Sequence, residues 1–238
     1  HAQTLLGVLE KIARTPRQLG SEPGTFLQTQ HFNETNAQKD GSIVRKTCFP
    51  ASLAELILSG PHFYVANPLY QTPNAECTTH RAYTPVDLTA VPDDYLPRTN
   101  YLPPEDREVF THRTPRLPWG RRQAVTEEYR LACRAMIGPS AERTSITAII
   151  PPRCSHINSV QTISFQKREL LLWSAFFSSS LVGDFFLKTT GRTNLHSTLL
   201  RFPACRPAGA QLVRTLLLQC LTCNYARLWE EAFCASFR

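Results

Sequence analysis

A short run of two cations, two hydroxyls and a glycine has side chains that suit phosphate binding. It consists of Lys188, Thr189, Thr190, Gly191 and Arg192. Glycine lets a backbone approach a ligand closely, and the cations and hydroxyls can contact phosphate oxygens. The order differs from the G-x-x-x-x-G-K-S/T pattern of nucleotide-binding loops. By its residue types the run is a candidate contact to a nucleic-acid backbone, with an ordinary solvated loop as the alternative.

A second set of polar residues has the types that contact base edges. We expect residues 145–150 and 156–165 to form two strands around a tight loop at 151–155. Arginine can pair with guanine, asparagine with adenine, and serine or threonine with either. A single histidine such as His156 is more often a structural hydrogen-bonding residue. The candidates at this hairpin are Arg143, Thr144, Arg153, His156, Asn158 and Ser159.

A helix is predicted over residues 126–137. Thr126 can cap its start, and apolar residues recur along one stripe. Arg130 and Arg134 are four residues apart and would share a face of this helix, where an exposed pair could contact two phosphates. A solvated face without a ligand is the alternative.

The remaining elements point to a mixed architecture. Apolar spacing predicts a helix at residues 4–14, and residues 25–32 and 42–49 are expected to pair as a hairpin. A capping box predicts a short helix at residues 52–59. Ten of the 18 prolines fall between residues 61 and 118, which excludes long helices there.

The C-terminal part is predicted to be helical. Residues 170–187 have the length of a membrane span, but Asp184 and several serines interrupt the run. We expect a buried helix with a break near the serines, and no membrane contact. A second, long helix is predicted over residues 210–237.

The sequence thus predicts an α+β fold with a small antiparallel sheet, packing helices and an irregular, proline-rich N-terminal half. We expect a docking and connecting region at residues 1–118 and a DNA-binding domain at 119–205. A closing helix would occupy 206–238. The chain opens on His1 rather than Met, so we expect further chain before it.

Charge is distributed unevenly along the sequence. Residues 112–168 carry ten Lys and Arg against three Asp and Glu, whereas residues 1–111 carry nine against twelve. A basic second half favours a polyanionic partner, and most of its cations are arginines, which suit bidentate contacts with phosphate or guanine. A solubilising surface is the alternative for a net charge of +7.

Six stretches of the chain are similar to segments of one known protein family. They are N-E-T-N-A-Q-K-D-G (33–41), G-P-H-F-Y-V-A-N-P-L-Y-Q-T-P (60–73), D-L-T-A-V-P-D-D-Y-L-P-R-T-N-Y (87–101), E-R-T-S-I-T-A-I-I-P-P-R-C-S-H-I-N-S-V (142–160), R-E-L-L-L-W-S-A-F-F-S-S-S-L-V-G-D-F-F-L (168–187) and K-T-T-G-R-T-N-L-H-S-T-L-L-R-F-P (188–203). Together they resemble the target-recognition region of large N6-adenine DNA methyltransferases of the restriction–modification (type IIG-like) and DISARM or BREX phage-defence kinds. The resemblance implies sequence-specific binding of double-stranded DNA. It also implies a separate catalytic methyltransferase domain that uses S-adenosylmethionine.

One tetrapeptide bears on catalysis. Amino-methyltransferases carry a D/N/S-P-P-Y/F/W motif that holds a flipped base, and Asn67, Pro68 and Tyr70 match it except that Leu69 replaces the second proline. No glycine-rich turn for S-adenosylmethionine occurs in the sequence. We therefore expect a DNA-binding chain that binds no cofactor itself. The alternatives are a divergent complete methyltransferase with Asn67–Tyr70 as active site, or a protein–protein scaffold of a defence complex.

The eight cysteines are too scattered for a compact disulfide framework. Without a secretion signal we expect reduced thiols and a cytoplasmic protein. Cys220 and Cys223 form a C-x-x-C, but a zinc site needs a second ligand pair at matching spacing. No metal site is therefore predicted.

Overall fold

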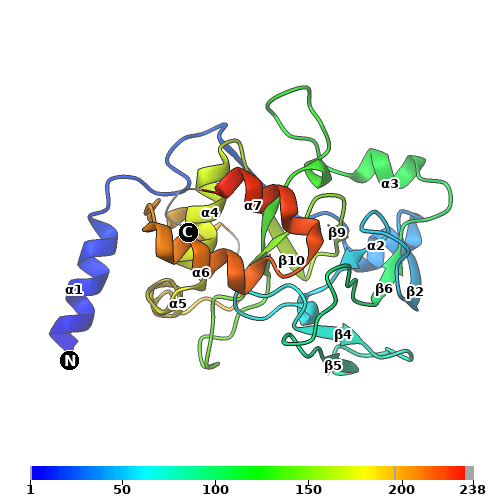
Figure 1. Cartoon of the computed structure of the whole chain (residues 1–238), viewed down its shortest axis with the longest axis horizontal. Helices are drawn as coiled ribbons and strands as arrows, with labels where there is room; N and C mark the ends of the chain where they lie inside the picture. The colour runs from blue at the N-terminus through cyan, green and yellow to red at the C-terminus, as the bar shows by residue number, and fades with distance from the viewer. Residues whose placement is uncertain (1, 196, 234–238) are drawn as a thin grey trace.

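The computed structural model describes residues 2–195 and 197–233. It has the α+β fold expected from the sequence. A four-stranded antiparallel sheet lies at the centre, in the order β1-β10-β7-β8 (Figure 1). Its strands are β1 (Phe26–Thr29), β7 (Arg130–Arg134), β8 (Thr147–Ile150) and β10 (Val160–Phe165). Residues on both sides of position 118 contribute to it, because β1 pairs with β10.

Both faces of the central sheet are covered. Side chains alternate across a strand, so Leu131 and Cys133 of β7 point to one face and Ala132 to the other. The first face packs against helix α4 (Arg168–Ser179) in the largest hydrophobic cluster. The second face packs against Leu58 and Phe63. Burial on both faces explains why β8 and β10 consist almost entirely of apolar and hydroxyl side chains.

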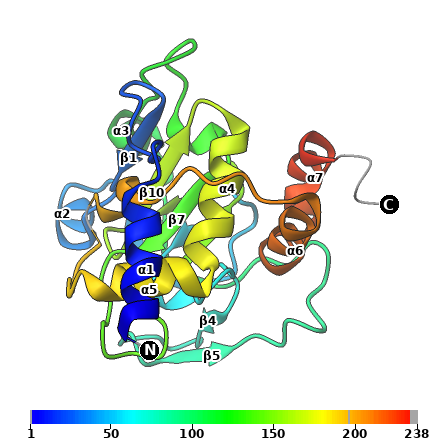
Figure 2. The same ribbon diagram turned by 90° about the vertical axis from the view of Figure 1, so that its left-hand side faces the viewer.

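The helical side of the molecule is built around α4. Helix α5 (Leu181–Thr189) follows it, and α6 (Gly209–Gln219) packs on it, with α7 (Ala226–Ala232) further along the chain (Figure 2). Helix α1 (Ala2–Ala13) extends away from the body, and its C-terminal half reaches the core through buried Ile12 and partly buried Val8 (Figure 1).

The expected break in the apolar run at residues 170–187 is confirmed. Helices α4 and α5 meet at Ser180 with a bend of 74°, and the Ser180 hydroxyl accepts a hydrogen bond from Gly183 N at 3.0 Å. A Cβ atom at Gly183 would lie 2.2 Å from Phe177 O, so only glycine permits this bend. Among the described residues no single helix is long and apolar enough to cross a membrane; only α4 and α5 taken together pass that test by length and composition.

Smaller elements make up the side away from the helices. Strand β2 (Val44–Cys48) pairs with β6 (Thr99–Leu102), β3 (Ile57–Leu58) runs parallel to β9 (Ser155–His156), and β4 (Gln71–Pro73) pairs with β5 (Tyr83–Pro85). Two short helices, α2 (Glu34–Lys39) and α3 (Glu108–Arg113), lie beside β2 and β6 (Figure 1). The 3-10 turns are η1 (Gly60–His62), η2 (Val125–Glu127), η3 (Thr198–Arg201) and η4 (Cys223–Tyr225).

The helix predicted over residues 126–137 is wrong. Residues 125–127 form a 3-10 turn, and Arg130–Arg134 form β7 at the centre of the sheet. The five residues alternate between the two faces, and all but Arg134 are buried. Partners distant in the sequence on both sides, β8 and β10, outweigh the local helical preference.

The two predicted hairpins are also wrong. Strand β1 pairs with β10, β2 pairs with β6, and the residues between β1 and β2 include helix α2. Strands β8 and β10 lie on opposite sides of β7 instead of pairing with each other. Each predicted turn is present, but the strands on either side of it pair with other strands and not with each other.

Two helix predictions also need correction. Ser52–Glu55 forms a turn that leads into strand β3 instead of a helix at residues 52–59. The helix predicted over residues 210–237 is interrupted at 220–225, between α6 and α7, and its residues 234–237 lie outside the described part.

Candidate nucleic-acid interface

Arg130, a predicted phosphate contact, is fully buried. Its Nη2 donates to Cys154 O and its Nε donates to Glu128 O at 3.3 Å. Its Nη1 lies 3.3 Å from His31 Nε2. With an exposed fraction of 0%, Arg130 presents no surface to a ligand in this structure.

His156, a predicted base contact, is buried beside Arg130. Its ring stacks on that of His31 with centroids 4.1 Å apart, and its Nε2 lies 3.0 Å from Thr162 Oγ1. Burial, together with the nearby Arg130 charge, lowers the pKa of His156 to about 3. Burial, with the His156 and Arg130 charges, also holds the pKa of His31 well below its ordinary value. His156 therefore acts as a neutral structural residue here.

Three further candidates meet around the buried carboxylate of Asp184. The backbone N–H groups of Thr144 and Ser145 each donate to Asp184 Oδ1 at 2.7 Å. Arg143 Nε lies 3.4 Å from the same oxygen, and Lys188 Nζ lies 3.7 Å from Oδ2. These contacts attach the loop before β8 to helix α5. The side-chain charges of Arg143 and Lys188, which were expected to face DNA, are thereby paired with Asp184.

The rest of the predicted phosphate contact lies at the end of α5. Thr189, Thr190, Gly191 and Arg192 are exposed. Both threonine hydroxyls donate to helix carbonyls, those of Phe186 and Leu187, at 2.7 Å. Gly191 has φ 63°, which glycine adopts without strain. Arg192 is the exposed cation that this segment offers.

The remaining candidates are scattered. Arg153 is exposed in the turn after β8, with φ 76°, and its backbone N–H donates to Thr126 O. Arg134 is half-buried at the other end of β7. Asn158 and Ser159 lie between β9 and β10. The structure therefore does not bring the thirteen predicted DNA-contacting residues onto one surface.

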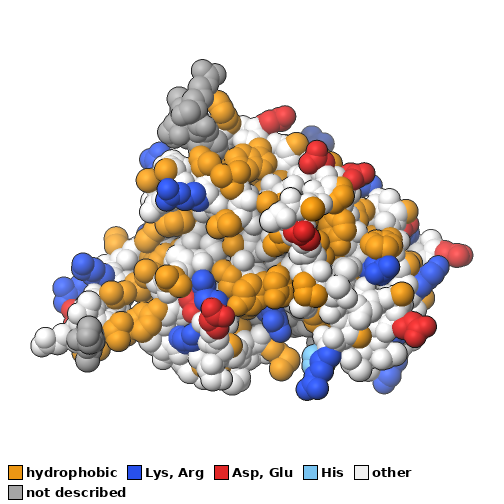
Figure 3. Space-filling view, turned by 60° about the horizontal axis from the view of Figure 1, so that its bottom comes forward, with side chains coloured by type: hydrophobic (Ala, Val, Ile, Leu, Met, Phe, Trp, Pro, Cys, Tyr) orange, Lys and Arg blue, Asp and Glu red, His pale blue; other side chains and the backbone are white. Residues whose placement is uncertain are grey.

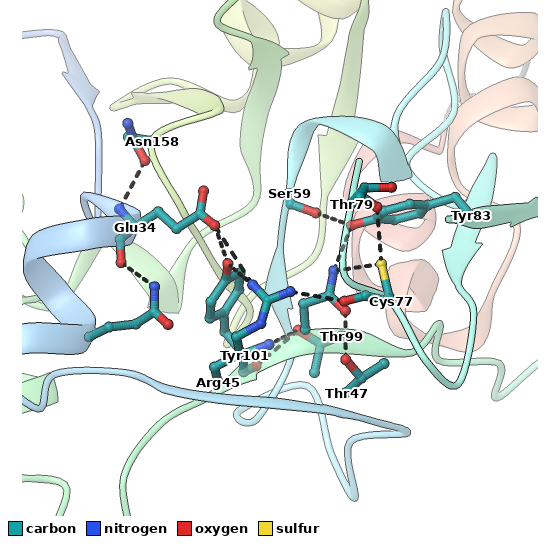
Figure 4. Close-up of polar contacts among 12 residues, drawn as sticks. Glu34, Arg45, Thr47, Ser59, Cys77, Thr79, Tyr83, Thr99, Tyr101 and Asn158 are labelled. Carbon is teal, nitrogen blue, oxygen red and sulfur yellow. Dashed lines mark hydrogen bonds and ion pairs between the residues drawn. The ribbon is translucent and has the colours of Figure 1, made fainter. Parts of the chain in front are cut away.

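Asn158 and Ser159 border a polar cluster between α2, β2 and β6 (Figure 4). Asn158 Oδ1 accepts from Glu34 N at 3.0 Å, and Ser159 Oγ accepts from Gly60 N. Tyr101 donates its hydroxyl to Glu34 Oε1, while Arg45 Nη1 donates to that hydroxyl at 2.8 Å (Figure 4). A pocket of about 150 Å³ opens beside them.

The polar groups of this cluster largely satisfy one another. Asn100 Nδ2 donates to Tyr83 OH at 3.0 Å, and Ser59 Oγ lies 2.8 Å from the same hydroxyl. Burial raises the pKa of Tyr83 to about 12, and burial, with the bond to Glu34, raises that of Tyr101. Both phenols therefore stay protonated at neutral pH. The arrangement fixes the small sheets against the core.

Asn67, Pro68 and Tyr70 form a closed turn. Asn67 is buried, and its Oδ1 accepts from Leu69 N at 2.7 Å. Tyr70 stacks on Tyr64 with centroids 4.8 Å apart. The neighbouring pocket, which Pro68 and Leu69 line, has a volume of about 20 Å³. The amide oxygen that would accept from a flipped base is thus engaged in its own turn.

A basic loop that the residue-by-residue prediction missed projects from the body (Figures 1 and 2). We call residues 115–125 the arginine loop. Arg116, Arg121 and Arg122 are all exposed, and the described residues include no acid paired with them. Trp119 is half-exposed and belongs to none of the hydrophobic clusters. The loop therefore presents three cations and one indole ring to solvent.

The base of the arginine loop is held in place. Leu117 and Val125 are fully buried. Leu117 N donates to Gln123 O at 3.0 Å, and Val125 N donates to Pro115 O at 2.9 Å. Gly120, with φ 62°, makes the turn at the tip. The sequence signal was available: residues 109–126 contain four arginines and no acid.

Positive charge is distributed unevenly over the surface. The face turned forward in Figure 3 carries hydrophobic atoms across its centre, with Lys and Arg atoms scattered among them and toward the edges. The arginine loop lies on the other side, at the top of Figure 1. The acid-free arginine loop is thus the strongest local candidate for a polyanion contact.

The cysteines in the described part of the chain form no metal-binding cluster. Within residues 2–195 and 197–233, no group of three or more His, Cys, Asp or Glu side chains is placed to hold a metal ion. Cys220 is buried whereas Cys223 is exposed. Burial raises the pKa of the Cys220 thiol, so that it remains protonated. A comparison of the sequence with protein-family models and one with curated proteins each returned no match.

Proposed function

We propose that the chain is a DNA-recognition module that grips double-stranded DNA through the arginine loop. The observation that carries the proposal is an anchored, projecting loop with three exposed arginines, a half-exposed tryptophan and no acid. Guanidinium groups contact phosphate oxygens bidentately, and such contacts supply most of the affinity of DNA-binding proteins. Trp119 at the tip supplies a ring that can stack on or insert between bases.

In this proposal Arg153 extends the contact. Its turn lies against the base of the arginine loop, because Arg153 N donates to Thr126 O. Arg192 is exposed at the end of α5 and remains a candidate phosphate contact. Arg130, Thr144 and His156 are buried, so their role is to hold the sheet and its loops in place.

The proposal also assigns the module to an N6-adenine DNA methyltransferase of a restriction–modification or phage-defence system. The resemblance in residues 33–203 supports this assignment. The catalytic domain and its S-adenosylmethionine would lie on another part of the enzyme, because the amide of Asn67 is engaged in its own turn. Titration calorimetry tests this point: binding of S-adenosylmethionine by the present chain would contradict it.

Fluorescence anisotropy with a labelled duplex tests the DNA contact. The triple variant R116A/R121A/R122A should lose affinity, and its dependence of log K on log salt should flatten by about 0.9 per lost phosphate contact. The matched control is K11A/R14A/R227A, which removes the same charge from Lys11 in α1, Arg14 just after it and Arg227 in α7. Equal losses in the two triple variants would show that only net charge matters, and would overturn the assignment to the loop.

A further inference from the structure

Arg134 is a half-buried cation without a counter-charge. The described residues provide its guanidinium with no hydrogen bond and no ion pair, and burial lowers its pKa. Arginine nevertheless stays charged at neutral pH. A desolvated charge without a partner costs folding free energy, so its retention in a packed strand calls for an explanation.

Arg134 differs in this respect from the other shielded cations. Every other Lys or Arg that the described part of the chain buries or half-buries has at least one recorded partner. These residues are Arg17, Arg98, Arg130, Arg143, Arg168 and Lys188.

The guanidinium borders a pocket of about 280 Å³ that lies between the end of β7 and the loop before β8. Tyr64, Met136 and Ile146 supply its apolar walls. Arg143 also borders it, but Asp184 already pairs with that residue. Glu142 is the acidic side chain in the lining, and the structure records no ion pair between it and Arg134. The pocket therefore has a positive charge at its wall and room for an anion.

The surroundings of the pocket are apolar. Met136 is 74% exposed, and Leu181 is 75% exposed at the start of α5. Arg143 Nη2 donates to Ser180 O, which places Leu181 next to the pocket lining. The pocket lies at the end of β7, whereas the arginine loop leads into the start of the same strand. Interfaces with DNA are polar and strongly basic, whereas those with proteins favour methionine, aromatic residues and arginine.

We propose that this pocket is a docking site for a protein partner that inserts an aspartate or glutamate side chain against Arg134. A carboxylate matches the planar guanidinium with two parallel hydrogen bonds. Apolar residues beside that acid would cover Met136 and Leu181. The charge missing from the chain itself is thus supplied by the partner, and a single shielded arginine of this kind can contribute much of the binding free energy.

Selection from a displayed library of random linear peptides tests the docking site. The full chain serves as bait, and R134M serves for counter-selection. The expected peptides contain Asp or Glu flanked by apolar residues, and replacing that acid with Asn or Gln should weaken binding by about tenfold or more. R201M is the matched control, because Arg201 is an exposed arginine that does not line this pocket. It should bind the peptides like the parent chain.

Two further variants make the result independent of folding defects in R134M. M136E changes an exposed side chain and should weaken peptide binding through repulsion of the incoming acid. E142Q removes the competing acid and should strengthen it. A library that yields no Arg134-dependent peptide overturns the proposal. Peptides that bind R134M as well as the parent also overturn it.

Duplex DNA and inorganic phosphate form the second arm of the test. If phosphate displaces the peptides, and R134M loses DNA affinity as strongly as R116A/R121A/R122A, the pocket is a nucleic-acid contact and the docking proposal falls. If DNA binding depends on the arginine loop alone, the docking proposal stands. Failure of DNA binding by the loop leaves the peptide result unaffected, so the two proposals can fail separately.

Discussion

Arg130 and Arg134 lie on the same face of β7, but among the described residues only Arg130 finds hydrogen-bond partners for its guanidinium. Two residues of the same type, four positions apart, thus have different surroundings. Arg130 ties β7 to the turn that contains Cys154, whereas Arg134 is shielded without a recorded partner. The difference leads directly to a measurable contrast in stability.

Replacing each arginine with methionine should change the free energy of unfolding in opposite directions. R130M leaves the buried acceptor Cys154 O without its donor, at a cost of about 1–3 kcal/mol, and also removes the part-buried bond to Glu128 O. R134M removes an uncompensated charge and keeps the aliphatic part, so the free energy of unfolding should stay level or rise. Urea titration measures both variants. Equal destabilisation by the two substitutions would contradict the contact pattern of β7.

Stability should fall as the pH drops below the ordinary histidine range. His156 is buried and His31 is half-buried beside it, and both have lowered pKa values, so the unfolded chain binds protons more readily than the folded one. The stabilisation is complete above the unfolded pKa of about 6.5 and is lost toward pH 3. At pH 5 the loss from His156 alone is on the order of 2 kcal/mol.

Urea midpoints measured between pH 7.5 and pH 5 check this pH dependence. His112 is exposed in α3, so H112Q should leave the profile unchanged. H156N should flatten the profile because the titrating ring is gone. A profile that is flat for the parent chain would show that the stacked pair is not buried in solution.

Substitution of Gly183 should damage the bend between α4 and α5. In G183A the new methyl group would lie within 2.2 Å of Phe177 O, so the backbone must shift. Overpacking of this kind costs about 1–3 kcal/mol. The control is G7A in α1, where a Cβ meets no atom within 4 Å. Thermal denaturation should show a lower Tm for G183A and an unchanged or higher one for G7A, because alanine favours helix.

Trp119 should contribute to DNA affinity separately from charge. W119A should weaken duplex binding by about 1–3 kcal/mol, the range for a ring that stacks on a base, while the salt dependence stays the same. W119F keeps a ring and should retain most of the affinity. Anisotropy titrations at two salt concentrations distinguish this outcome from a lost phosphate contact. If W119A binds DNA with the affinity of the parent chain, the indole ring makes no contribution and only the arginines of the loop contact DNA.

The sequence predicted elements whose signals are local. The helix near the N-terminus and the interrupted apolar run at residues 170–187 were both evident from spacing and from Ser180. The strand at residues 130–134 was not, because R-L-A-C-R is too short to separate a helical stripe from alternation. Its identity depends on pairing with β8 and β10, which no local pattern records.

The residues predicted to contact DNA were chosen by residue type, but burial and pairing within the fold determine which of them can reach a ligand. Thr144 and Lys188 have the chemistry of DNA-binding residues, but Asp184, forty and four residues away from them respectively, engages both. The sequence did not reveal that partnership. The arginine loop could have been found from composition alone, because its stretch of arginines contains no acid.

In the arginine loop, the residues that are exposed to solvent differ from the residues that anchor the loop to the body. Leu117 and the backbone bonds of residues 115–125 fix the stem, whereas Gly120, Arg121 and Arg122 at the tip are exposed. Exchanges at the tip therefore leave the hydrophobic interior untouched. The molecule can acquire a new binding preference there without refolding, so the tip is the natural place to redesign its specificity.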